Sequence, residues 1–365
     1  MGPAADRLVG LDVARCLALL GMVATHLFDE RTASGDLTTV QWVAGGRSSA
    51  LFAVLAGASL ALMTRHQRRG RDLLAMAARA ALIAVAGLAL GGVGSGLAVI
   101  LTYYGVLFLM GLPFVRLGAP SLALLCAAWV LVGPVVSHLV RPHLPPRGFD
   151  SPTFAQLADP GRLASELFFT GYYPVVPWLA YLLAGLALGR LDLRNPHVAG
   201  PVALAGAGLA ALSTAVSRAL ADPARAEDGA TGMFGNPPAD GDWSWLLLVA
   251  PHSSTPFDLV QTIGSAMLVI GSCLLVEHLL PRPGVVALAI CFGAGAMTLT
   301  LYSLHVLLHT PDVWPREDPG TYVLHAGILL AIGAGYAAAG RRGPLERLVG
   351  LPLQLARRDG RQGTR

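Results

Sequence analysis

Apolar residues gather along this chain in runs of roughly 20 residues, and short polar segments separate the runs. Each run is long enough to cross a hydrocarbon core of about 30 Å as one helix. The runs lie at residues 9–28, 46–64, 73–92, 97–115, 121–140, 170–189, 200–218, 258–280, 284–308 and 321–339. The pattern predicts an all-α fold: a polytopic integral membrane helix bundle with about ten transmembrane helices.

The charged residues predict how this bundle lies in the membrane. If the N-terminus is placed in the cytoplasm, the inside segments hold 16 arginines and the outside segments hold 8. Cytoplasmic loops are normally the richer in basic residues. We therefore expect both termini inside (N-in/C-in), in a multi-pass protein of the plasma (cell) membrane. The basic pI of about 9.1 then reflects contact with the lipid bilayer, and no nucleic acid partner is expected.

Ionisable residues inside an apolar run are costly in lipid and mark candidate sites. Asp12 and Arg15 stand three residues apart in the first run, so they share a helix face. We expect a structural ion pair, with a functional role as the alternative. His26 lies eleven residues beyond Arg15, which returns it to within about 20° of the same face. The stripe should face protein, with His26 near the outer end.

The ninth run, which contains LTLYSLHVLLHT, carries a second candidate histidine, His305. His305 and His309 have the i, i+4 spacing of helical metal sites, but no third ligand is evident, so no metal is expected. Two interpretations stay open: a catalytic or binding role for His305, and a hydrogen-bonded contact between helices.

Further polar residues divide between the two sides of the membrane. The candidate substrate-binding residues toward the outer side are Arg47, Tyr103, Tyr104 and Asp258. Arg47 opens the second run, where a cation at a helix N-terminus needs an anion nearby or must reach the interface. On the inner side lie the arginines Arg68, Arg69 and Arg71. They are most simply a topology anchor, and binding the phosphates of a cytosolic cofactor is the alternative.

Two segments of the chain resemble a known family. RLVGLDVARCLALLGMVATH and LAGASLAL are similar to the bacterial heparan-alpha-glucosaminide N-acetyltransferase-like membrane proteins. The shared marks are an Asp-x-x-Arg, a polar residue eleven positions later and a Gly-x-Ser in the second run. LTYYGVLFLM, PHSSTPFDLV and LTLYSLHVLLH resemble an overlapping bacterial membrane protein family, DUF418. In this chain, His26 stands where the acetyltransferases place a polar amide.

The resemblance implies a membrane-bound acyltransferase of the cell envelope. It would move an acyl group, most simply acetyl, from cytosolic acyl-CoA (acetyl-CoA) to an extracytoplasmic glycan or lipid-linked acceptor. Residues 1–340 would form the transmembrane acyltransferase-like helical domain, and residues 341–365 a basic cytoplasmic tail. A transporter or flippase of a small molecule or lipid-linked intermediate is the alternative, and a non-catalytic membrane partner is a third class. Homo-oligomers are left open.

Acyl transfer from a thioester needs a base for the acceptor and hydrogen-bond donors for the oxyanion. His26 and His305 are the candidate bases. We expect them to converge with Arg47 in a cavity open to the outer side, with Tyr103 or Tyr104 on its wall. His26 lies roughly 20 Å from the cytoplasmic face by helix rise. Either the donor inserts deeply, or the acyl group is relayed.

Overall fold

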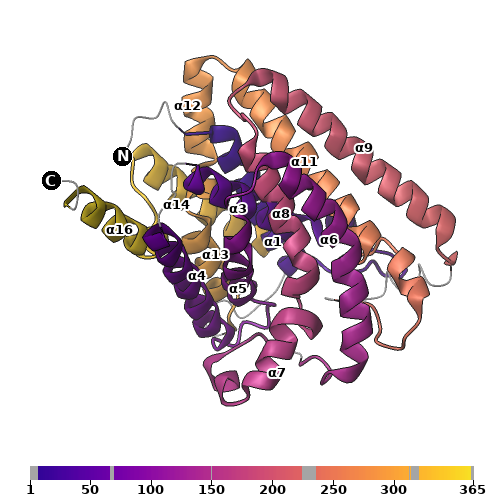
Figure 1. Ribbon diagram of the computed structural model, residues 1–365. Coiled ribbons are helices and arrows are strands. Elements are labelled where there is room, and N and C mark those ends of the chain that lie inside the picture. The colour runs from indigo at the N-terminus through magenta and orange to yellow at the C-terminus, as the bar shows by residue number, and fades with distance from the viewer. Residues whose placement is uncertain are drawn as a thin grey trace.

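A computed structural model describes residues 7–65, 70–148, 150–223, 236–311, 313 and 320–362, with side chains as far as 356. In these ranges every regular element is a helix, apart from one bridge between Arg31 and Leu37. The helices are α1 Val9–Leu27, α2 Thr39–Ala44, α3 Arg47–Thr64, α4 Gly70–Gly91, α5 Leu101–Gly111, η2 Leu112–Phe114, α6 Ala119–Val140, η3 Arg141–His143, η4 Phe154–Ala158, α7 Pro160–Ser165, η5 Glu166–Thr170, α8 Val175–Arg190, α9 Pro196–Leu220, η6 Trp243–Leu247, α11 Pro256–Leu279, α12 Arg282–Cys291, η7 Gly293–Ala296, α13 Thr298–Leu308, α14 Thr321–Ala338, α15 Pro344–Leu348 and α16 Leu351–Gln362. The all-α membrane bundle is confirmed (Figure 1).

The number of full-length spans is smaller than the sequence predicts. Among the described residues, 7 helices are long and apolar enough to cross a membrane. The count rises to 8 if Pro160–Thr170 and Val175–Arg190, which meet at 53°, form one bent span. The expected count of about ten is therefore not confirmed. The runs 97–115 and 284–308 form shorter helices, namely α5 with η2, and α12 with α13.

Glycine explains both short runs. Gly94 and Gly96 adopt φ of +70° ahead of α5, a conformation that favours glycine, and the helix begins only at Leu101. The run 284–308 breaks at η7, where Gly295 lies against the backbone of α1 with no room for a side chain. In the run 284–308, a hydrophobicity pattern counts the glycines of η7 as part of one continuous run and so predicts a longer helix.

Helix α1 lies inside the bundle and packs against α3, α11 and η7 (Figure 1). Its first turn is capped by Glu277, at the end of α11. The carboxylate accepts hydrogen bonds from the backbone N–H of Val9 at 3.0 Å and of Gly10 at 2.7 Å. A carboxylate at a helix N-terminus satisfies unpaired donors and opposes the helix dipole. The residues of α1 are therefore held at fixed depths in the bundle.

Residues 344–356 pack against the end of the bundle at which α1 begins. Glu346 in α15 accepts hydrogen bonds from the backbone N–H of Thr300 at 3.0 Å and from its hydroxyl at 2.5 Å. Val349 and Leu353 are buried. The predicted division between helical domain and basic tail stays a prediction. We call this end of the bundle the inner end and the opposite end the outer end, as the arginine distribution predicts.

Candidate functional site

Three histidines from three helices form a connected chain at the outer end of the bundle. Nδ1 of His26 (α1) lies 3.0 Å from Nε2 of His305 (α13). Nδ1 of His305 lies 3.3 Å from Nδ1 of His325 (α14). The rings of His26 and His305 are stacked, with centroids 5.2 Å apart. The structure thus brings the two candidate bases together and adds His325, which the sequence reasoning missed.

The two contacts allow two patterns of protons, one in which the donors run from His26 to His325 and one in which they run the other way. Each contact joins two ring nitrogens, so one must donate and the other accept. Both contacts are satisfied if His26 donates from Nδ1 to Nε2 of His305, and His305 donates from Nδ1 to Nδ1 of His325. In this arrangement Nε2 of His26 keeps a lone pair. His26 can then accept a proton from a group in front of it.

A fourth histidine, His309, lies at the end of α13 and contacts two backbone carbonyl groups. Its Nδ1 lies 3.0 Å from the carbonyl oxygen of Ser95, and its Nε2 lies 3.3 Å from the carbonyl oxygen of His26. Carbonyl oxygens only accept, and a neutral imidazole has one N–H. A neutral His309 therefore serves one carbonyl at a time, whereas a protonated ring serves both.

A cavity of about 480 Å³, the outer cavity, opens in front of His26. Polar residues on its wall include His26, Ser49, Tyr172, Tyr173, His252, Tyr302 and His309. His305 and His325 do not line it: their exposed fractions are 0% and 1%. Within the chain of three histidines, His26 is the member that a bound molecule can touch.

A second cavity of about 270 Å³, the inner cavity, lies deeper in the bundle. Its polar lining includes Arg15, Ser59, Arg79, Tyr104, Tyr302 and Glu346. Met22 and Tyr302 line both cavities, so a thin layer of side chains separates them. Arg15 lies about 10 Å before Met22 by helix rise. Helix α1 is thus a wall common to both cavities.

The two candidate tyrosines lie away from His26. Tyr104 lines the inner cavity, and its hydroxyl donates to the carbonyl oxygen of Ser49 at 2.8 Å. Tyr103 lines neither cavity: it is buried, and its hydroxyl accepts from the backbone N–H of Tyr172 at 3.3 Å. The expectation that one of them stands on the wall of the cavity in front of His26 is wrong in this geometry. Tyr302 takes that place.

Arg47 also lies apart from the histidines, so its expected convergence with them is wrong. Its side chain donates to the carbonyl oxygen of Trp42 and lies over the Trp42 ring. Both Arg47 and Asp258 line a third cavity on the other side of the α3 N-terminus. The sequence predicts a depth for Arg47 but gives no information on which way the helix end turns.

His252 helps to separate the outer cavity from this third one. Its Nε2 accepts from the backbone N–H of Gly46 at 3.2 Å. Burial lowers the pKa of His252 to about 4, so the ring is neutral at physiological pH. The backbone φ is +60° at His252 and +55° at Ser254, an unusual conformation for non-glycine residues.

The remaining predicted residues lie toward the inner end. Asp12 lies 2.5 Å from Arg15 and 2.5 Å from Arg7, and Arg15 also donates to the hydroxyl of Ser59 at 2.7 Å. Arg71 is exposed at the start of α4. Arg68 and Arg69 lie outside the described residues. In the described part of the chain, no group of His, Cys, Asp and Glu is arranged to hold a metal ion.

Comparison with known proteins identifies one family. The profile of the family described as heparan-alpha-glucosaminide N-acetyltransferase, catalytic, matches residues 7–212. This range is more than half of the chain and runs from the start of α1 into α9. It includes His26, whereas His305 and His325 lie beyond it. No curated protein matches the chain closely.

Proposed function

Because the chain belongs to the heparan-alpha-glucosaminide N-acetyltransferase catalytic family, we propose that it transfers an acyl group, most simply acetyl, from cytosolic acyl-CoA to an acceptor on the outer side of the plasma membrane. One observation carries the proposal: the inner and outer cavities meet at Met22 and Tyr302. The thioester arm of the donor would enter the inner cavity, and the acceptor would enter the outer cavity. The reacting groups would then meet at the layer between them.

The inner cavity has features that suit the donor. Its modest volume fits the flexible arm of a coenzyme A thioester better than the whole nucleotide. Arg79 lines the inner cavity together with Glu346, Arg15 lines it while paired with Asp12, and Arg71 lies exposed at the start of α4. Guanidinium groups bind phosphate oxygens well. The nucleotide phosphates would therefore stay at the inner end of the bundle, on the cytosolic side.

His26 and Tyr302 supply the chemistry of the transfer. The acceptor oxygen or nitrogen attacks the thioester carbonyl carbon, and His26 takes the proton from the acceptor. The C–S bond breaks, and the thiolate takes the proton from His26 to leave as the free thiol. The hydroxyl of Tyr302 accepts from the backbone N–H of Ile100 at 3.2 Å. Its own O–H can therefore donate to the developing oxyanion.

Release of free thiol from acetyl-CoA by the purified protein tests the proposal. Water serves as the basal acceptor, and amino sugars are added as acceptors. We expect His26→Asn to lower thiol release by about 100-fold or more without changing the melting temperature. His197→Asn is the matched control, because His197 is exposed at the start of α9. If the parent protein releases no thiol but moves solutes across vesicle membranes, it is a transporter.

A further inference from the structure

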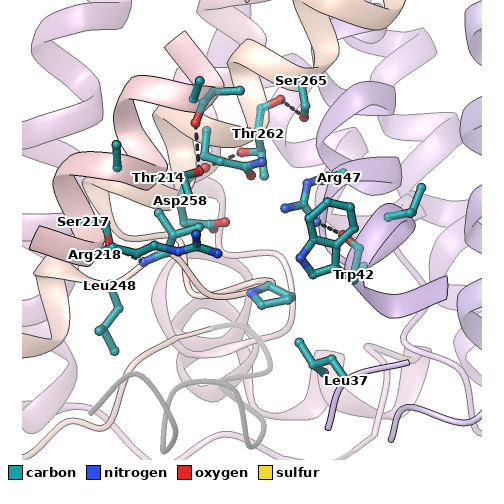
Figure 2. A pocket seen from close by; sticks show the side chains of 18 of the residues that line it. Leu37, Trp42, Arg47, Thr214, Ser217, Arg218, Leu248, Asp258, Thr262 and Ser265 are labelled. Atoms are coloured by element: carbon teal, nitrogen blue, oxygen red, sulfur yellow. Dashed lines mark hydrogen bonds between the residues drawn. The ribbon is translucent and has the colours of Figure 1, made fainter. Parts of the chain in front are cut away.

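The third cavity, which we call the lateral groove, has a volume of about 860 Å³ (Figure 2). It lies between α2, the start of α3, and the outer halves of α9 and α11. Two chain segments separate it from the outer cavity. Gly45 and Pro251 face the groove, while their neighbours Gly46 and His252 face the outer cavity. The two cavities are therefore back to back.

The lateral groove opens beside a lipid-facing surface. Helix α9 lies at the edge of the bundle (Figure 1), and its large apolar side chains point outward. Leu212 is 64% exposed and Leu220 is 56% exposed. Trp42, at the groove, is 62% exposed. Tryptophan favours the level of the lipid headgroups. These exposed side chains would place the groove at the membrane interface, with lipid acyl chains beside α9.

Two arginines point into the lateral groove from opposite walls (Figure 2). Within the described residues, Arg218 makes no hydrogen bond or ion pair. Arg47 stands at the first position of α3, where the helix dipole adds positive potential. Among the described residues that line the groove, the one carboxylate is that of Asp258, which is buried and accepts from the backbone N–H of Ser254 at 3.0 Å. No ion pair joins Asp258 to either arginine, so the groove keeps an excess of positive charge.

We propose that the lateral groove binds the phosphate of a lipid in the outer leaflet. Guanidinium groups of Arg47 and Arg218 would bind the phosphate oxygens from two sides. The acyl chains would lie along the small and apolar residues of the walls, such as Ala211, Ala215 and Leu268. The volume lies in the range of ordinary ligand sites and leaves room for a headgroup beyond the phosphate. Cations at this depth are costly unless an anion accompanies them.

The position of the groove suggests what the lipid does, a role that rests on the proposed acyl transfer. The lipid headgroup would lie one chain segment away from the outer cavity and His26. That segment contains the strained residues His252 and Ser254, and such strain persists mainly at functional sites. A phosphate-bearing lipid is therefore assigned as the carrier of the acceptor.

Lipid binding can be measured apart from catalysis. The full-length protein, freed of lipid in neutral detergent, is titrated with phosphatidylglycerol, and bound lipid is counted by native mass spectrometry. A phosphate-free galactolipid is the second probe, and soluble glycerol phosphate is the competitor. We expect one phosphatidylglycerol per chain, retained at least about 10-fold better than the galactolipid, and no displacement by equimolar glycerol phosphate.

Variants show whether the arginines hold the lipid. Arg218→Gln and Arg47→Gln should each weaken retention about 10-fold, since charge-assisted bonds to phosphate are lost. Arg282→Gln is the control: Arg282 is also exposed and also makes no bond or ion pair within the described residues. If Arg47→Gln does not fold, Arg218→Gln alone decides, because its side chain supports nothing in the described structure. Unchanged retention in Arg218→Gln, equal retention of the galactolipid, or displacement by glycerol phosphate would overturn the lipid assignment.

Failure of the lipid site and failure of the acyl transfer give different results. If lipid retention depends on Arg218 but the parent releases no thiol from acetyl-CoA, the proposed function fails and the lipid site stands. If the parent releases thiol with water as acceptor and Arg218→Gln retains lipid as well as the parent, the lipid site fails and the acyl transfer stands. The control Arg282→Gln should leave the water-dependent release unchanged, since Arg282 lines neither of the two reaction cavities.

Discussion

Replacing His305 by leucine tests the role of the histidine that contacts the proposed base, His26. His305 has no access to the outer cavity, so it acts through His26 rather than on a bound molecule. Its Nε2 lies 3.0 Å from Nδ1 of His26. Under the proposed function it accepts from that nitrogen, which keeps Nε2 of His26 free to act as the base. In His305→Leu, Nδ1 of His26 loses its hydrogen-bond partner inside the protein. The reactive form of His26 should then become a minor population.

The size of the effect follows from the lost hydrogen bond. A buried donor left without an acceptor costs about 2 kcal/mol. If that cost falls on the reactive form of His26, turnover drops about 30-fold, because 1.36 kcal/mol corresponds to a factor of ten. A general base itself contributes 10² to 10⁴. A loss near 30-fold therefore indicates positioning, whereas a loss well above 100-fold would identify His305 as the base.

Rescue by glutamine separates positioning from a merely structural role. The amide of His305→Gln can accept from His26 and donate to His325, so it reproduces both bonds without carrying a proton. We expect thiol release within about 10-fold of the parent for this variant. The melting temperatures of both variants are measured in parallel. A folded His305→Leu protein with parental turnover would refute the argument, and so would a glutamine variant as slow as the leucine variant.

Three further predictions follow from the structure. Asp12→Ala leaves Arg15 without its carboxylate partner in the bundle and should lower the free energy of unfolding by about 3 kcal/mol. Replacing both residues by leucine should recover part of this loss. Denaturation of the parent, the single variant and the double variant measures both effects. The pKa of His252 is about 4 in the folded protein and 6.5 when unperturbed. The stability that its neutral ring contributes above pH 6.5 is therefore lost as the pH falls toward 4. Over that range the melting temperature of His252→Asn should fall less than that of the parent. In a cysteine-free background, an impermeant maleimide outside the cell should label a cysteine at position 153 and not one at position 70. Labelling at position 70 would show that the predicted topology is wrong.

The sequence was sufficient for the membrane class and for the stripe on α1. Hydrophobic runs predict helices reliably when the runs are long and uninterrupted, as in α1, α4 and α11. It was insufficient for the run 284–308, because the contact between Gly295 and the α1 backbone is a tertiary feature. It also could not show that Glu277 caps α1, since the partners are far apart in the chain.

The residues of the candidate site also divide into features that the sequence predicts and features that it does not. His26 and His305 are each ionisable within an apolar run, which makes them candidates, and His325 carries the same signal in the last run. The direction of Arg47 depends on the turn at Gly46, whose φ of +68° redirects the chain at the start of α3. Periodicity gives the depth and face of a residue on a straight helix, but not the orientation at a helix end.

Under the proposed acyl transfer, the depth of His26 does not require a relay of the acyl group. From the inner face to His26 is most of a membrane thickness, but the inner cavity extends from Arg15 to Met22 along α1. Met22 and His26 are four residues apart, about 6 Å of helix rise. A thioester at the Met22 layer would therefore lie close to an acceptor held in front of His26. None of the four cysteines, the strongest nucleophiles for an acyl carrier, lines either cavity. Under the proposed acyl transfer, the arrangement is compatible with direct transfer across this layer, and the covalent route that it disfavours is one through cysteine.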